Sequence, residues 1–119
     1  MWTSKTIKIK KFPVSGELKN LYFTVDYKGN RIVRVWLHIG KGSRQEIADA
    51  EAIIGLVNVI LEYGVDEYKY SDIIRTLSGI DSGIRYRYGE HTCTSISDLI
   101  AEIIKQEVSY ESKIKELRT

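Results

Sequence analysis

The chain has 119 residues, 43% of them hydrophobic and 29% charged, which predicts one ordinary globular domain over residues 1–119. Its formal net charge of +2 gives no electrostatic case for duplex nucleic acid or an anionic membrane as a partner. The sequence has no apolar run of about 18 residues, no signal-peptide pattern and one cysteine, Cys93. It therefore predicts neither a membrane span nor an internal disulfide, and we expect a cytoplasmic protein.

The first forty residues predict an antiparallel sheet. Residues 6–12 alternate Ile with Lys, which is typical of a half-exposed edge strand. Strands over residues 18–27 and 31–39 come next, joined by the hairpin turn at residues 28–30. Alternation places one set of apolar side chains toward the core: Leu21, Phe23, Val25, Val33, Val35, Leu37 and Ile39.

The opposite face of this sheet is less polar than a solvent face usually is. Tyr22, Ile32 and Trp36 are predicted to lie there. They form either an exposed contact surface or scattered aromatics covered by the first strand or the C-terminal tail.

A long helix is predicted within residues 40–64. Ser43 suits the N-cap, Glu46 completes a capping box, and Gly64 suits the residue after the helix. One apolar stripe is formed by Ile47, Ala50, Ile54, Val57 and Leu61.

The remaining surface of this helix is apolar as well. Ala52, Ile53, Leu56, Val59 and Ile60 surround the stripe, whereas a surface helix needs an apolar arc of only about 100°. We therefore expect a homodimer or higher oligomer; the alternative is a helix buried within its own monomer. Gly55, unfavourable inside a helix, would be explained by close approach of another backbone.

The second half of the chain predicts two more helices. A short helix over residues 71–77 is capped by Ser71, and Ser95 with Asp98 opens the last helix. Residues 80–94 between them predict an ordered loop or a short irregular hairpin. Residues 105–119 form either a C-terminal helical arm or a frayed end. The fold class is therefore α+β: a sheet of about three or more strands, with a long central helix and further helices on one face.

Residues 40–43, Gly40-Lys41-Gly42-Ser43, are one candidate ligand site. Two glycines allow close backbone approach, and a helix N-terminus favours an anion. The P-loop pattern is absent. The alternative is a tight strand-to-helix turn with a solvated lysine.

The second candidate site alternates Arg with Tyr: Arg85, Tyr86, Arg87 and Tyr88. Arginine can hold phosphate oxygens, and tyrosine can stack on a base. His91 and Thr92 can contact ribose or base edges, and Arg75 on the preceding helix could join them. The alternative is a solvated strand whose outer face is polar.

Catalysis has little support in the sequence. His38 and His91 are not paired with a nucleophile at a diagnostic spacing. His91 and Cys93 supply two donors, fewer than a zinc site requires. We therefore expect no enzyme activity, no metal and no cofactor.

Three motifs follow one another along the chain: the Gly-Lys turn, A-E-A in the long helix, and L-x-G-I at Leu77 to Ile80. Over about residues 21–101 the chain resembles the TSCPD domain, best known at the C-terminal end of adenosylcobalamin-dependent ribonucleotide reductases. The cysteine-containing signature of that family appears here as Cys93-Thr94-Ser95-Ile96-Ser97-Asp98, without Cys-Pro-Asp. The reductase's catalytic barrel is missing.

Its size and core also make the chain similar to phage anti-Thoeris sponges. This resemblance implies an oligomer that sequesters cyclic ADP-ribose isomers such as glycocyclic ADP-ribose, and in some members cyclic oligonucleotides, without cleaving them. The residues of the second candidate site are chosen on chemical grounds. The alternative is an accessory nucleotide- or protein-binding module of ribonucleotide reductase or DNA metabolism.

Overall fold

The computed structural model describes residues 2–40 and 44–118, with side chains described for residues 2–40 and 45–108. The chain forms two compact units, Met1–Tyr63 and Gly64–Thr119. Within the described ranges there are five strands and three helices. The three-stranded antiparallel sheet and the helices confirm the α+β class. The central position of the long helix, the single domain and the homo-oligomer stay predictions.

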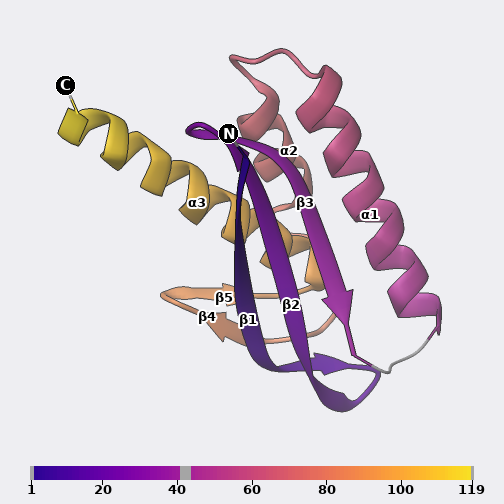
Figure 1. The fold of residues 1–119 in the computed structure, drawn as a ribbon. Helices are drawn as coiled ribbons and strands as arrows, with labels where there is room; N and C mark the ends of the chain where they lie inside the picture. Colours follow the sequence, from indigo (N-terminus) through magenta and orange to yellow (C-terminus); the bar gives the residue numbers. More distant parts are fainter. Residues whose placement is uncertain (1, 41–43, 119) are drawn as a thin grey trace. The chain divides into compact units, whose positions relative to one another are not determined.

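The first unit is built on a sheet with strand order β1-β2-β3 (Figure 1). Its strands are β1 Trp2–Val14, β2 Glu17–Lys28 and β3 Arg31–Ile39. β1 and β2 are joined by Ser15 and Gly16, which both have positive φ, as a type I′ hairpin turn requires. β3 has the predicted bounds, whereas β1 and β2 are longer than predicted.

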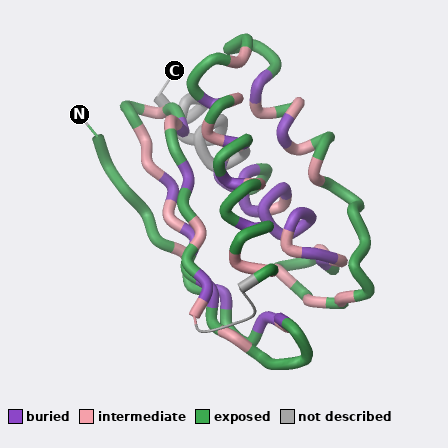
Figure 2. The backbone as a smooth tube through the Cα atoms, turned by 90° about the vertical axis from the view of Figure 1, so that its right-hand side faces the viewer, coloured by how far each residue is buried: buried purple, intermediate pink, exposed green. Residues whose placement is uncertain are grey.

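Buried and exposed residues alternate along β2, as the sequence predicts (Figure 2). Leu21, Phe23 and Val25 are fully buried. The prediction is wrong for Ile32, which was expected on the open face beside Trp36 but is fully buried. The reason is a bulge: Tyr27 pairs with Ile32 and Asp26 with Arg34. Val33 is thus an extra residue of β3 without a partner on β2. It reverses which residues of β3 face the core before and after the bulge.

A second bulge lies in β1. Ile9 pairs with Leu21, but the next pair is Phe12 with Lys19. Lys11 within this bulge has a φ of 55°, and its amide donates to the Asn20 side chain at 3.3 Å. The bulge allows Ile9 and Phe12, three residues apart, to be buried together.

Helix α1, Arg44–Tyr63, packs against β3. Four members of the predicted stripe are buried, Ala50, Ile54, Val57 and Leu61, and Ile47 is partly buried. Asn58 bonds to both the amide and the carbonyl of Val35, at 2.9 and 3.0 Å, so its side chain pairs with the edge strand as another strand would. Glu46 accepts a hydrogen bond from Ser15. The predicted cap Ser43 lies outside the described residues.

The second unit contains α2 Lys69–Leu77, β4 Tyr86–Tyr88, β5 His91–Cys93 and α3 Ile96–Arg118. The hairpin alternative for residues 80–94 is therefore confirmed. Ser71 is not the cap of α2: the N-cap position is Tyr68, without a side-chain bond. The Ser71 hydroxyl instead donates to the Tyr68 carbonyl at 2.9 Å, because the helix begins two residues earlier than predicted.

Ser95 caps α3 as predicted, since its hydroxyl accepts the Asp98 amide at 3.0 Å. The apolar face of α3 is fully buried at Leu99, Ile100, Ile103 and Ile104. The backbone stays helical to Arg118, which confirms the helical alternative for the C-terminal residues up to that point. No helix in the described ranges is both long and apolar enough to cross a membrane.

Candidate functional site

The β4–β5 hairpin separates the members of the predicted Arg-Tyr site. Tyr86 pairs with Cys93, Arg87 with Thr92, and Tyr88 with His91. Arg87 and Thr92 are exposed on one face, whereas Tyr86 and Tyr88 are half-buried on the other. Burial raises the pKa of both tyrosine hydroxyls. The arginines are therefore available to a ligand in solution, and the tyrosine rings are only partly so.

The two arginines differ in their partners. Arg85 makes two contacts to Asp81, at 3.1 and 3.2 Å, and donates to the Ile84 carbonyl at 2.7 Å. The pKa of Asp81 is lowered, first by the hydrogen bond from Arg85 and then by the Gly83 amide. Arg87 donates its Nε to the Gly89 carbonyl at 3.2 Å. A ligand must therefore compete with Asp81 for Arg85.

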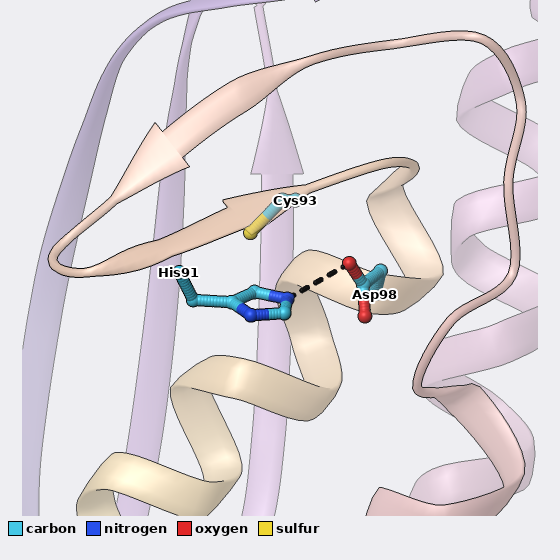
Figure 3. A group of neighbouring side chains, drawn as sticks. All are labelled: His91, Cys93 and Asp98. Atoms are coloured by element: carbon cyan, nitrogen blue, oxygen red, sulfur yellow. Dashed lines mark hydrogen bonds and ion pairs between the residues drawn. The ribbon is translucent and has the colours of Figure 1, made fainter.

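Behind the hairpin, Asp98 collects hydrogen bonds from three segments of the chain. Its carboxylate accepts the Gly79 amide at 2.9 Å and the Thr94 amide at 3.1 Å. His91 Nε2 lies 3.0 Å from the same carboxylate (Figure 3). Gly79 has a φ of 78°, a conformation that favours glycine. The end of α2, the hairpin and the start of α3 are thus held by one side chain.

The charge of Asp98 is stabilised by these bonds. Burial alone would raise its pKa, but the Gly79 amide, His91 and the Thr94 amide together lower the pKa below the usual value. Because a carboxylate only accepts, His91 Nε2 carries the proton between them. The Asp98 side chain is 4% exposed and that of His91 41%, so the imidazole is the part of this pair that solvent reaches.

His91, Cys93 and Asp98 could also hold a metal ion. Their donor atoms all lie within 4.8 Å of one another, and nitrogen, sulfur and carboxylate oxygen are donors that zinc accepts. The sequence reasoning counted two of these donors and missed Asp98, which it assigned only to the helix start. Burial raises the pKa of the Cys93 thiol to about 11, so metal binding would have to displace its proton.

The other predicted site residues are Arg75 on α2 and Lys41, Gly42 and Ser43 before α1. Lys41, Gly42 and Ser43 lie outside the described residues. Arg75 is exposed on α2, where it pairs with Asp72 at 2.9 Å. Two acidic residues that were not predicted as part of the site contact its members. Asp81 binds Arg85, and Asp98 binds His91.

A scan of protein families matches the TSCPD domain over residues 3–108. The chain belongs to the TSCPD-domain family. Searches of curated proteins and of solved structures found no significant match. In this TSCPD domain, the L-x-G-I motif supplies the Gly79 amide, and the Thr94-Ser95 to Asp98 segment supplies the helix cap and the carboxylate that binds that amide. Two motifs of the resemblance are therefore joined by a hydrogen bond.

Proposed function

We propose that this TSCPD-domain protein is a phage anti-defence sponge. It binds a nucleotide-derived immune signal, a cyclic ADP-ribose isomer such as glycocyclic ADP-ribose, and holds it unchanged. Family membership and the resemblance to anti-Thoeris sponges support this proposal. The structural observation that carries it is the exposed face of the β4–β5 hairpin, where Arg87 lies opposite Thr92.

Arg87 is better suited than Arg85 to bind a ligand that contains a pyrophosphate. In the described part of the chain its hydrogen bond uses Nε, which leaves the two terminal nitrogens for phosphate oxygens. Thr92 adds a hydroxyl directly across the hairpin. Arg85 adds a second positive charge once a phosphate replaces Asp81. A stacking role for Tyr86 or Tyr88 would use the exposed part of each ring.

Binding without chemistry is supported by the state of the cysteine. Cys93 is fully buried, and its thiol pKa is raised to about 11. A neutral, buried thiol is a poor nucleophile. We therefore expect a bound signal to be released intact.

Native mass spectrometry with a panel of cyclic ADP-ribose isomers and cyclic oligonucleotides tests this function. We expect a stoichiometric adduct that is released unchanged on denaturation. Arg87→Ala should weaken binding at least about tenfold, since a charged hydrogen bond contributes about 1.5 to 3 kcal/mol, and Arg85→Ala should weaken it less. Lys105→Ala, an exposed cation on α3, is the matched control. Absence of any adduct would reject the sponge, and unchanged affinity in Arg87→Ala would reject this site.

A second candidate, implied by the resemblance to the TSCPD domain of ribonucleotide reductases, is an accessory module of such an enzyme. This module would bind a reductase rather than a cyclic signal. Mixing the protein with a purified adenosylcobalamin-dependent reductase from which the TSCPD domain has been removed tests it. Restored activity or a stable complex would support the module, and no interaction would count against it.

A further inference from the structure

The sheet of the first unit has one face that α1 does not cover. α1 is attached to β3 through Asn58 and Val35, and the side chains buried with Val35 include Leu21, Phe23 and Val25. The alternating positions of β1 and β2, and those of β3 after its bulge, point to the opposite side. We call this side the open sheet face. It is defined here by six exposed residues: Trp2, Lys8, Tyr22, Lys28, Arg34 and Trp36.

Aromatic rings are unusually exposed on the open sheet face. Trp2 is 55% exposed, Trp36 50% and Tyr22 37%. The Arg34 guanidinium lies 5.5 Å from the Trp36 ring centroid and 5.9 Å from that of Trp2. These are cation–π distances, so the arginine holds the two indole rings on one surface. Nucleobases stack on rings and guanidinium planes of this kind.

The charge of the open sheet face is complementary to a polyanion. Lys8, Lys28 and Arg34 are exposed cations on the three strands. Among the described residues that point to this side, Asp26 carries a carboxylate. It accepts a hydrogen bond from the Ser4 hydroxyl at 2.6 Å and lies 3.4 Å from Trp36 Nε1. Asp26 therefore fixes the Trp36 ring, while the surrounding excess of positive charge attracts phosphate.

The arrangement is an extended surface, longer than one nucleotide requires. Trp2 and Lys8 are six residues apart on β1, which at about 3.3 Å per residue is about 20 Å. Tyr22 on β2 pairs with Lys8 on one side and with His38 on the other. Two residues further along β2, Thr24 pairs with Trp36. In known nucleic-acid-binding folds, aromatic side chains on the surface of a sheet stack two or three unpaired bases. In a duplex the bases are already stacked on each other and would not reach the rings.

We propose that the open sheet face binds single-stranded nucleic acid, with Trp2, Trp36 and Tyr22 stacking on bases and Lys8, Lys28 and Arg34 contacting phosphates. All residues of this site belong to the first unit, and the proposal does not depend on the proposed sponge function.

Fluorescence anisotropy with labelled oligo(dT) and oligo(U) of about 12 nucleotides tests the proposal. We expect binding that weakens steeply between about 50 and 200 mM salt and quenches tryptophan fluorescence. Trp36→Ala should weaken binding at least about fivefold, because stacking contributes about 1 to 3 kcal/mol per base. Trp36→Phe should weaken it less, and Lys8→Glu should weaken it and reduce the salt dependence.

Tyr68→Ala, which removes another exposed aromatic just before α2, is the matched control and should bind as the wild type does. Tighter binding of oligo(U) would assign the partner as RNA, and equal binding would assign unpaired strands of either kind. The proposal is overturned if neither oligonucleotide binds at low salt, if Trp36→Ala binds normally, or if duplex binds as tightly. Cyclic ADP-ribose binding in Trp36→Ala should be unchanged, so this result is independent of the sponge test.

Discussion

Among single residues, Asp98 joins separate segments of the second unit through one side chain. Three segments of the second unit donate hydrogen bonds to its carboxylate. Because its pKa is lowered in the folded protein, the charged form contributes stability above the unfolded pKa. That contribution is lost as the pH falls through the folded value. The second unit should therefore lose stability in acid below about pH 4.

Asp98→Asn should lower the stability of the protein at pH 7 by about 2 kcal/mol, since the buried carboxylate is replaced by a neutral acceptor for the part-buried amides of Gly79 and Thr94. The difference from the wild type should shrink at low pH, where the wild-type carboxyl is protonated. Urea unfolding at several pH values measures both effects. Glu90→Gln in the hairpin turn, an exposed carboxylate, should change stability by less than about 0.5 kcal/mol. A difference between Asp98→Asn and wild type that stays constant with pH would contradict this account.

Cys93 should be almost inert toward thiol reagents in the folded protein. Its side chain is fully buried, and burial, together with Asp98 and Glu102, raises its pKa to about 11. Labelling with a chromogenic disulfide at pH 8 should be slow until denaturant is added. Cys93→Ser combined with Thr92→Cys, which places the thiol on the exposed face of the same strand, should react fast. Rapid labelling of native Cys93 would show that the hairpin opens.

Among the helices and strands, periodic features were predictable from the sequence, whereas single insertions were not. The bounds of β3, the buried stripe of α1 and the cap at Ser95 were predictable because each has a local pattern. The bulge at Val33 was not, since Ile32 and Val33 are both apolar and either could face the core. The Asp98 bonds were missed because the Gly79 amide is nineteen residues away and backbone donors leave no trace in the sequence.

Two glycines should respond to alanine in opposite ways. Gly79 has a φ of 78°, so Gly79→Ala should cost about 1 to 2 kcal/mol. Gly55 lies inside α1 with nothing within 4 Å of an added Cβ, so Gly55→Ala should stabilise the first unit by about 1 kcal/mol. Thermal and urea unfolding of both variants measures this contrast. A loss of stability at Gly55 would instead indicate that another backbone packs there in solution.

For the molecule as a whole, the expected homo-oligomer depends on the second face of α1. Leu56 is 67% exposed, Val59 52% and Tyr63 76%, although the sequence predicted this helix to be buried nearly all round. Covering this apolar face with a second copy would remove it from water. The predicted association uses residues of α1 that belong neither to the hairpin site nor to the open sheet face.

Light scattering across a range of protein concentrations tests the oligomer. We expect the wild type to associate and the double variant Leu56→Glu with Val59→Glu to remain monomeric, because buried charges oppose association. Leu18→Glu, which changes an exposed leucine on β2, is the control and should associate as the wild type does. A wild-type protein that stays monomeric at every concentration would contradict the prediction of a homo-oligomer.

The site was predictable only in part. Arg85 and Arg87 were identified because alternating Arg and Tyr is a local pattern, and both are exposed. The half-burial of Tyr86 and Tyr88 depends on the pairing of β4 with β5, whose register has no local pattern in the sequence. For the open sheet face, the sequence predicted Tyr22 and Trp36 correctly and Ile32 wrongly. Trp2 was missed because it joins them only through the register of β1 with β2.

The bonds that tie both Gly79 and His91 to Asp98 suggest how this fold can vary. The two residues bracket an eleven-residue segment, residues 80–90, whose ends are fixed to the same carboxylate. Lengthening a segment with fixed ends is inexpensive, about 0.6 kcal/mol for each doubling. Loops of other lengths and sequences could therefore be grafted between these anchors. The second unit would then serve as a display scaffold, with new recognition properties installed without redesigning the helices beneath.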